Sequence, residues 1–295
     1  MMANVLIAHP NIADGGALSG GDWQVPLGNL QDRRLTRLAR SATAAKEDTT
    51  FTLDLGPEAK LFQVIAVVKH NLSTSAVWRV RVAHNPDFTS PIFDNALDLP
   101  PGVTPTLPYA WPVIYPIGML EWEDDNFWSG TVSEEERLSY PSILLIVLPR
   151  LTPGRYIRID IEDEGNADGY VELGRLFVSR AWRPKFNASA GATTGWESDT
   201  AVQRSLSGTP YFDRKPGRRV TRFELNGMST DEAMVRVFEM QRRAGLDGEL
   251  LLVWDQDDML HRLRRSYLGR QRQLSPIAQA FINHNSTVLE IEELT

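Results

Sequence analysis

The chain has 295 residues, of which 42% are apolar and 23% are charged, and this length is typical of about two folded domains. It contains no cysteine, which excludes disulfides, thiolate zinc sites and a cysteine nucleophile. The net charge of −7 argues against wholesale binding of nucleic acid, so nucleic acid is not an expected partner.

The sequence predicts neither a signal peptide nor a membrane segment. The N-terminus, MMANVLIAHP, has no basic region and no long apolar core. The longest apolar run, residues 143–148, is far too short to cross a bilayer and predicts a buried strand. A glycine-rich stretch at residues 15–21, GGALSGG, lacks the lysine followed by serine or threonine of a phosphate-binding loop, so we interpret it as a surface loop.

Alternating apolar and polar residues predict several strands in the first half of the chain. Residues 51–56 alternate in this way and end at a glycine turn. Residues 62–68, FQVIAVV, are almost continuously apolar, which favours a central strand. Residues 77–82, VWRVRV, alternate again, with Trp78 on one face and Arg79 on the other.

Two more strands joined by an acidic turn are predicted within residues 154–182. Polar residues alternate with isoleucines over residues 156–161, and residues 171–178 resume a strand after the turn. The turn itself, EDEGNADG at residues 162–169, offers carboxylates of the kind that Ca²⁺ prefers. Its spacing does not match the EF-hand loop, so a turn without metal is the favoured interpretation and we assign no metal site.

The order of these motifs resembles the galactose-binding-like (discoidin-type) jelly roll, and most of all the versions carried by bacteriophage tail proteins. The motifs are DLG at residues 54–56, HNL at 70–72, YIRI at 156–159 and ELG at 172–174. The resemblance covers roughly residues 25–183. It implies that residues 1–184 form a jelly-roll β-sandwich.

An insertion of about residues 85–140, rich in proline and tryptophan, interrupts this resemblance. A stretch of this length without periodicity is uncommon inside a compact domain and is usually functional or interfacial. Its aromatic residues allow three interpretations: a contact surface for a partner, a cover for the jelly roll's own core, or a platform for sugar rings. The candidates for an interface are Trp111, Tyr115, Trp122 and Trp128.

The character of the chain changes near Pro184. Residues 185–199 are small and polar and predict a linker or arm. Within residues 200–295, a strand is expected at 219–225, followed by a helix and further strands, including 249–254.

The helix has clear start and stop signals. Ser229 followed by Glu232 forms a capping box, in which each residue satisfies backbone donors of the first turn. Gly245 ends the helix. This element order resembles the small split barrel with one flanking helix that phage tail-tube and distal-tail ring proteins share. Distal tail proteins usually place the ring domain before the jelly roll, whereas here the order is reversed.

Arginines are frequent in this second domain, and acidic residues are interspersed among them. Arg218, Arg219, Arg264 and Arg265 are candidates for an interface because arginine pairs well with carboxylates across subunits. Acidic loops in the first domain and arginines in the second would suit a head-to-tail ring, in which each subunit presents two different surfaces. The alternative is an ordinary solvated surface.

No motif points to catalysis. The five histidines include no pair at metal-ligand spacing, and the sequence has no GxSxG elbow, phosphate loop or dinucleotide fingerprint. The acidic clusters at residues 121–125 and 134–136 do not select a pair of carboxylates that would face each other across a glycosidase cleft. We therefore expect neither an enzyme nor a cofactor.

Together the two resemblances imply a structural subunit of a phage tail tip or baseplate. Such a subunit would form a ring, hexameric in these families, that joins the tail tube to the tail hub or fibres. Its expected partners are copies of itself, the tail tube protein and the hub or other baseplate proteins, and its expected location is the virion after synthesis in the bacterial cytoplasm. The alternative is a carbohydrate-binding module that attaches to a host-surface glycan.

Overall fold

The computed structural model describes residues 3–98, 108–116 and 118–295. Part of the predicted insertion, residues 99–107 and residue 117, lies outside the described residues. The chain folds as two compact units. We call Pro10–Ala181 with Asp258–Arg264 the sandwich unit, and Met1–His9 with Trp182–Asp257 and Arg265–Thr295 the sheet–helix unit.

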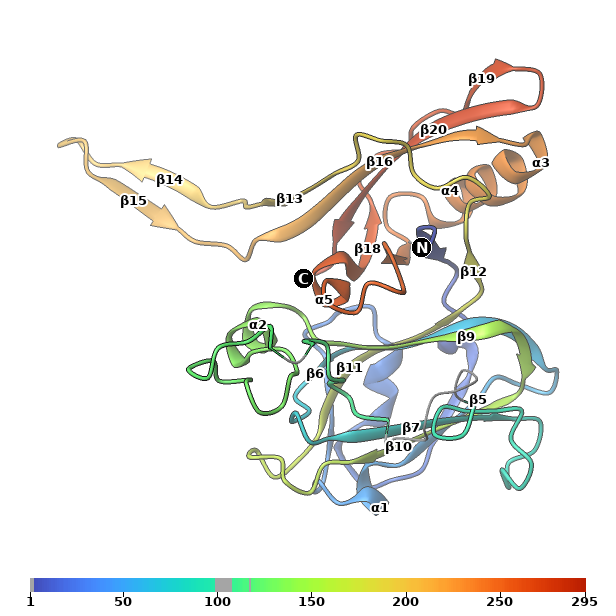
Figure 1. The fold of residues 1–295 in the computed structure, drawn as a ribbon, viewed down its shortest axis with the longest axis vertical. Coiled ribbons are helices and arrows are strands. Elements are labelled where there is room, and N and C mark those ends of the chain that lie inside the picture. Colours follow the sequence, from blue (N-terminus) through green and yellow to red (C-terminus); the bar gives the residue numbers. More distant parts are fainter. Residues whose placement is uncertain (1–2, 99–107, 117) are drawn as a thin grey trace. The chain divides into compact units, whose positions relative to one another are not determined.

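The sandwich unit contains two five-stranded antiparallel sheets (Figure 1). The first sheet has the order β2 (Ala17–Ser19), β5 (Phe51–Asp54), β10 (Tyr156–Glu162), β7 (Val77–Ala83) and β8 (Phe93–Asp94). The second has the order β3 (Trp23–Val25), β4 (Ala39–Ser41), β11 (Glu172–Ser179), β6 (Lys60–His70) and β9 (Ile143–Gly154). Successive long strands alternate between the two sheets, which is the connectivity of a jelly roll.

The sandwich core lies between the inner faces of these sheets. The alternation predicted from the sequence puts Phe51, Val80 and Ile157 on the inner face of the first sheet, and all three are fully buried. Phe62 and Leu176 face them from the second sheet. The helical segments of the unit are short: η1 (Ala13–Gly15), η2 (Leu27–Gln31), α1 (Lys46–Thr49) and α2 (Glu134–Ser139), with α5 (Arg262–Arg265) at its boundary.

The sheet–helix unit is built on one antiparallel sheet of eight strands. Its order is β12 (Ala181–Trp182), β1 (Leu6–Ala8), β17 (Glu249–Val253), β18 (Ser266–Gln271), β20 (His284–Glu293), β16 (Arg218–Met228) and β13 (Thr193–Glu197), with β19 (Ala278–Phe281) paired to β20. A separate hairpin, β14 (Ala201–Arg204) and β15 (Pro210–Asp213), extends between β13 and β16 away from this sheet (Figure 1).

One continuous helix covers the apolar face of this sheet. It consists of α3 (Thr230–Glu232), a π-helical stretch η3 (Ala233–Phe238) and α4 (Glu239–Ala244). The helix start and stop are confirmed: the Ser229 hydroxyl accepts the Glu232 backbone N–H at 3.1 Å, and Gly245 ends the helix with a φ of 55° that favours glycine. The other half of the predicted capping box is not formed, because the Glu232 carboxylate accepts from Trp182 and Lys185. Val237 on the helix packs in the same buried cluster as Phe223 of β16.

The division into units differs from the predicted domains in three respects. Residues 258–264, inside the predicted second domain, belong to the sandwich unit. Strand β1 pairs with β17, so the first residues of the chain belong to the second unit. Strand β13 lies within the predicted linker at 185–199, and pairs with β16. The predicted fold class is confirmed: the chain is mainly β, with a jelly-roll sandwich and a second unit that has one flanking helix.

Candidate functional site

The β14–β15 hairpin, which we call the arm (residues 199–217), is the most exposed element of the sheet–helix unit. All eight strand residues are exposed. Its turn is closed by the Gly208 N–H donating to the Ser205 carbonyl at 2.9 Å, and Gly208 has a φ of 86°. Because the strands pair only with each other, the arm forms a two-stranded sheet with two open edges.

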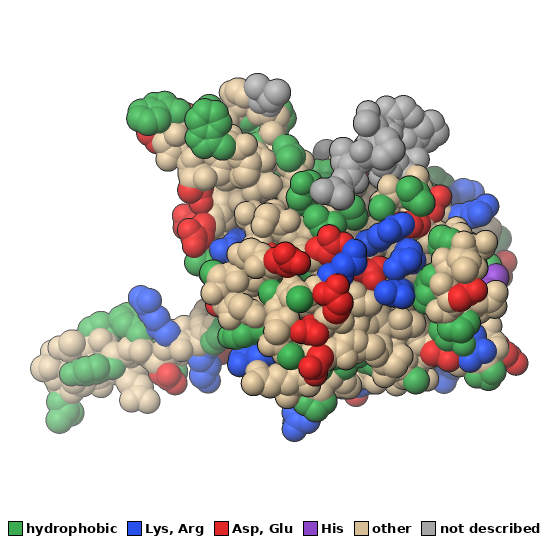
Figure 2. All heavy atoms as spheres, turned by 90° about the horizontal axis from the view of Figure 1, so that it is seen from below, with side chains coloured by type: hydrophobic (Ala, Val, Ile, Leu, Met, Phe, Trp, Pro, Cys, Tyr) green, Lys and Arg blue, Asp and Glu red, His purple; other side chains and the backbone are tan. Residues whose placement is uncertain are grey.

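One face of the arm is apolar. Residues that lie opposite each other in an antiparallel pair point to the same face. Val202 lies opposite Phe212, and Arg204 lies opposite Pro210, so these four side chains share a face. Leu206 at the tip adds a further exposed apolar side chain. Apolar side chains (green) cover much of the arm at the left of Figure 2.

The arm also carries cations. Arg204, Arg214 and Lys215 are exposed, and no ion pair joins any of them to an acidic residue within the described residues. At the base of the arm Arg218 pairs with Asp199. Asp213 at the end of β15 is an exposed carboxylate, but the three cations outnumber it, so the arm presents apolar area together with a net positive charge.

Residues 118–139 of the predicted insertion, which we call the acidic loop, are the most exposed aromatic segment of the sandwich unit. Trp122 is 76% exposed and Trp128 is 92% exposed. Phe127 contacts Trp128 edge to face, with ring centroids 5.0 Å apart. The exposed acidic residues around them are Glu121, Glu123, Asp124, Asp125, Glu134 and Glu135.

Hydrogen bonds, one of them buried, hold the acidic loop in shape. The Asn126 side chain is buried and donates to the Thr131 carbonyl at 2.6 Å. The Asp125 carboxylate accepts the Glu134 backbone N–H at 2.7 Å, and the Ser133 hydroxyl caps α2. The two exposed tryptophans are therefore displayed by an ordered loop.

The two other predicted aromatic candidates are not displayed in the same way. Trp111 is only 5% exposed, and its indole N–H donates to the Leu72 carbonyl at 3.0 Å. Its ring lies against His70, with centroids 5.3 Å apart. Tyr115 is half-buried, and its hydroxyl donates to Glu136 at 3.4 Å. Trp111 therefore covers the core of the sandwich, which was one of the interpretations of the insertion, and is not available to a partner.

The four predicted arginines are all engaged within the chain. Arg219 is buried and forms an ion pair with the equally buried Glu293, so it is not an accessible interface residue. Arg218 pairs with Asp199 at the base of the arm. Burial of a charge is tolerated only when it is paired and hydrogen-bonded, and Arg219 meets that condition.

Arg264 is the last residue of a short return of the chain into the sandwich unit, and Arg265 is the first residue after it. Leu263 packs against the sandwich core, and Arg264 pairs with Glu136 of α2. In the sheet–helix unit, the guanidinium of Arg265 lies 5.3 Å from the ring centroid of Trp254. Both arginines therefore stabilise the fold of their own unit.

The outer face of the first sandwich sheet carries a network of ion pairs. Figure 2 looks onto this sheet from below Figure 1 and shows basic (blue) and acidic (red) side chains gathered over it. Asp160 accepts hydrogen bonds from Arg81 at 2.6 Å and from Arg158 at 2.9 Å. Burial raises the pKa of Asp160, but these two hydrogen bonds outweigh it and hold the pKa below its ordinary value. The network pairs its own charges, although the buried Nε of Arg81 has no hydrogen-bond partner among the described residues.

The acids of the predicted turn at 162–169 are also used internally. Asp163 is buried and accepts hydrogen bonds from Ser73 and Asn166. Asp168 accepts from the Asn71 side chain at 2.8 Å. Among the described residues there is no group of three or more acidic or histidine side chains that would hold a metal ion. In the same residues, no helix is long and apolar enough to cross a membrane.

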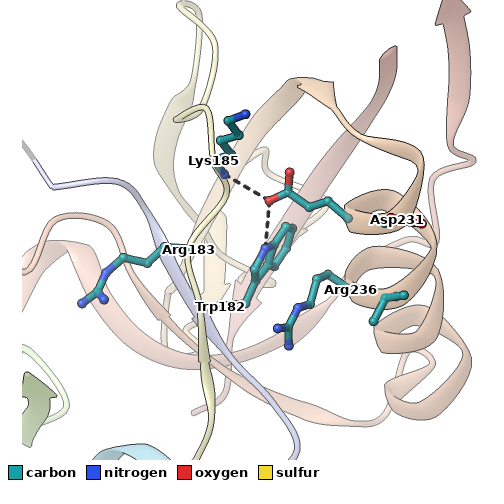
Figure 3. Close-up of a pocket in the computed structure, with 7 residues that line it drawn as sticks. Trp182, Arg183, Lys185, Asp231 and Arg236 are labelled. Atoms are coloured by element: carbon teal, nitrogen blue, oxygen red, sulfur yellow. Dashed lines mark hydrogen bonds between the residues drawn. The ribbon is translucent and has the colours of Figure 1, made fainter. Parts of the chain in front are cut away.

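An open pocket of about 390 Å³ lies beside the helix of the sheet–helix unit (Figure 3). The Glu232 carboxylate in its wall accepts the Trp182 indole N–H and the Lys185 backbone N–H, each at 3.1 Å. Arg183 points away from Trp182, whereas Arg236 lies near it. The sequence predicts Glu232 only as a capping residue of the helix and gives no sign of its role in the pocket wall. Charges of both signs line the pocket, and its central carboxylate is already satisfied by the chain's own donors.

No protein-family model matches this sequence, and no curated protein matches it. Solved structures similar to part of the chain include a carbohydrate-binding module from a family 31 glycoside hydrolase of Clostridium perfringens, with 10% identity and a TM-score of 0.36 over 58% of this chain and 97% of that one. Another is the family 32 module of NanJ from C. perfringens in complex with galactose, with 11% identity and a TM-score of 0.33 over 60% and 99%.

A third is a fucose-binding module of Streptococcus pneumoniae, with 12% identity and a TM-score of 0.34 over 58% of this chain and 95% of the other. Each of these modules is matched over nearly its whole length, while about two fifths of the present chain lies outside the similarity. The strand order described above, rather than these similarities, establishes the jelly-roll fold.

Proposed function

We propose that this chain is a structural subunit that assembles with copies of itself, and that the arm is its assembly element. The observation that carries this proposal is the exposure of the arm: a two-stranded sheet whose eight residues all face solvent and whose one face is apolar. An isolated two-stranded hairpin is marginally stable in water. Contiguous exposed apolar surface marks a site of association. An arm of this kind is stabilised when a partner covers it.

The setting that agrees with the sequence resemblances is the tip of a phage tail. There the chain would form a ring between the tail tube and the hub or fibres of the virion. The long strands of the sheet–helix unit would supply the rigid part of such a ring, and the arm would reach the neighbouring subunit.

The test is the mass of the purified full chain as a function of concentration, measured by light scattering and accompanied by negative-stain microscopy. We expect rings or larger assemblies whose population grows with concentration. A variant in which residues 201–213 are replaced by a short glycine–serine turn should remain monomeric while keeping its thermal unfolding temperature. A wild-type chain that stays monomeric at every concentration would overturn the proposal.

A second candidate function is carbohydrate binding by the sandwich unit. The observation that favours it is the pair of exposed tryptophans, Trp122 and Trp128, on an ordered loop whose carboxylates can accept hydrogen bonds from sugar hydroxyls. Flat aromatic faces suit sugar rings. Two of the similar structures are a module in complex with galactose and a fucose-binding module.

A glycan array with the full chain separates the two candidates. Specific binding that is lost in Trp128→Ala and Trp122→Ala, but kept in the exposed control Val113→Ala, would establish the second function. An array without specific binding would exclude it for the glycans tested and leave the assembly proposal in place.

A further inference from the structure

The arm requires a surface that matches both its apolar face and its charge. Val202, Phe212 and Leu206 need apolar contacts, and Arg204 lies on the same face as Val202. Lys215 continues this positive charge toward the base of the arm. A complementary surface therefore combines exposed apolar side chains with carboxylates that have no cationic partner in the chain.

The acidic loop has this combination. Its exposed apolar side chains are Met119, Trp122, Trp128 and Leu138. Glu121 and Glu123 flank Trp122 directly, are exposed, and form no ion pair within the described residues. Tryptophan is among the residues that contribute most to protein interfaces, so Trp122 and Trp128 suit the role of anchors.

The other exposed apolar surfaces of the described residues fit less well. On the helix, Val235 and Phe238 are exposed beside Arg236, and the nearby Glu239 is already paired with Arg242. Those arginines would repel the cations of the arm. The turn between β19 and β20 exposes Phe281 and Ile282, but residues 277–286 around them contain no acidic residue.

We propose that the arm of one copy docks on the acidic loop of a second copy. The inference rests on the proposed self-assembly and names the surface that receives the arm. The overall charge agrees with it: residues 1–181 hold 23 acidic and 15 basic residues, whereas residues 182–295 hold 15 acidic and 16 basic residues. Because the arm and the acidic loop are different surfaces, the contact is heterologous, and it generates a ring when its rotation closes.

The apolar contacts and the charges have separate roles in this contact. Burial of Phe212 and Trp122 supplies most of the stabilisation, because exposed ion pairs contribute little individually. The charges select the register and the partner, since bringing like charges together is costly. Assembly should therefore weaken as salt is added.

Charge reversal tests the contact directly. The arm reversal is Arg204→Glu with Lys215→Glu, and the loop reversal is Glu121→Lys with Glu123→Lys; all four side chains are exposed. Each reversal alone should raise the dissociation constant of the assembly by about tenfold or more. Both reversals in one chain, or an equimolar mixture of the two single reversals, should restore assembly because opposite charges face each other again.

A matched control for the arm reversal is Arg33→Glu with Arg150→Glu, which lowers the net charge by the same amount at exposed positions of the sandwich unit. It should leave assembly unchanged. Circular dichroism and the unfolding temperature establish that every variant is folded. If the wild-type chain assembles and the reversals act like the control, or if the combined reversal does not restore assembly, the docking surface is wrong while self-assembly stands. If the wild-type chain is monomeric at every concentration, the proposed self-assembly itself is wrong.

Discussion

Val202 of β14 lies directly opposite Phe212 of β15, and 55% and 60% of their respective surfaces are exposed. A cross-strand pair of this kind normally stabilises a sheet by packing against a third layer. Here no layer covers it within the described residues. The pair therefore belongs to an element whose stability depends on contacts outside its own unit.

Hydrogen exchange should detect this dependence. In dilute, monomeric chain we expect the amides of β14 and β15 to exchange much faster than those of β16, whose strand is paired on both sides. In assembled protein the arm amides should slow by about tenfold or more, because opening the hairpin then requires loss of the contact.

The amides of β16 serve as the internal control and should change little between the two samples. Equal protection of arm and β16 in the monomer would contradict the prediction. So would an arm that exchanges at the same rate in both samples.

The tryptophans of the insertion should differ in how much each contributes to the free energy of unfolding. Trp111→Ala removes a buried ring and its hydrogen bond to the Leu72 carbonyl, so we expect a loss of about 3–5 kcal/mol in the free energy of unfolding. Trp128→Ala removes a ring that is 92% exposed and should change the free energy of unfolding by less than about 0.5 kcal/mol. Urea unfolding followed by circular dichroism measures both, and similar losses in the two variants would refute the assignment.

This difference between Trp111 and Trp128 also shows a limit of prediction from the sequence. The insertion has no periodicity, so no pattern distinguishes a tryptophan that covers the core from one that faces solvent. The strands of the sandwich were predictable, because alternation along 156–161 depends only on local residues. The same holds for the cap formed by Ser229, which acts within one helical turn.

These local patterns could not predict which distant segments contact each other. Strand β1 pairs with β17, which lies more than 240 residues away, and no local pattern indicates this pairing. Arg219 occupies a strand whose alternation was recognised, yet its partner Glu293 could not be inferred, and the pair is buried rather than interfacial. The exposure of the arm is likewise a property of the fold and not of a local sequence pattern.

His70 should make the stability of the sandwich unit depend on pH. Its Nδ1 accepts the Leu72 backbone N–H at 3.3 Å, and its Nε2 is buried without a hydrogen-bond partner, although the residue as a whole is only half-buried. Burial, with a smaller contribution from the charge of Arg137, lowers the pKa of His70 from 6.5 to about 3.

The sign of the effect follows from linkage. Between pH 6.5 and about 3 the unfolded chain binds a proton that the folded chain does not, so the free energy of unfolding decreases as the pH falls. The slope contributed by one such group is at most about 1.4 kcal/mol per pH unit. His70→Asn, which keeps an acceptor for the Leu72 N–H but does not titrate there, should flatten this part of the curve. Urea unfolding between pH 7.5 and pH 4.5 measures it, and an unchanged slope would exclude His70 as the source.

Arg219 and Glu293 should behave as a coupled pair in the sheet–helix unit. The Glu293 carboxylate accepts the Arg219 Nε–H at 2.8 Å and its backbone N–H at 3.1 Å, and the guanidinium lies 4.9 Å from the centroid of the Tyr267 ring. Removing one member of a buried pair leaves a charge without its partner, so Arg219→Met and Glu293→Gln should each cost about 3 kcal/mol or more. The double variant should cost clearly less than the sum of the two, because no buried charge remains unpaired. Urea unfolding of the four proteins gives the coupling free energy.

Glu290→Gln, on the same strand and less buried, is the control and should show no coupling to Arg219. Additive losses would show that the two side chains stabilise the sheet independently.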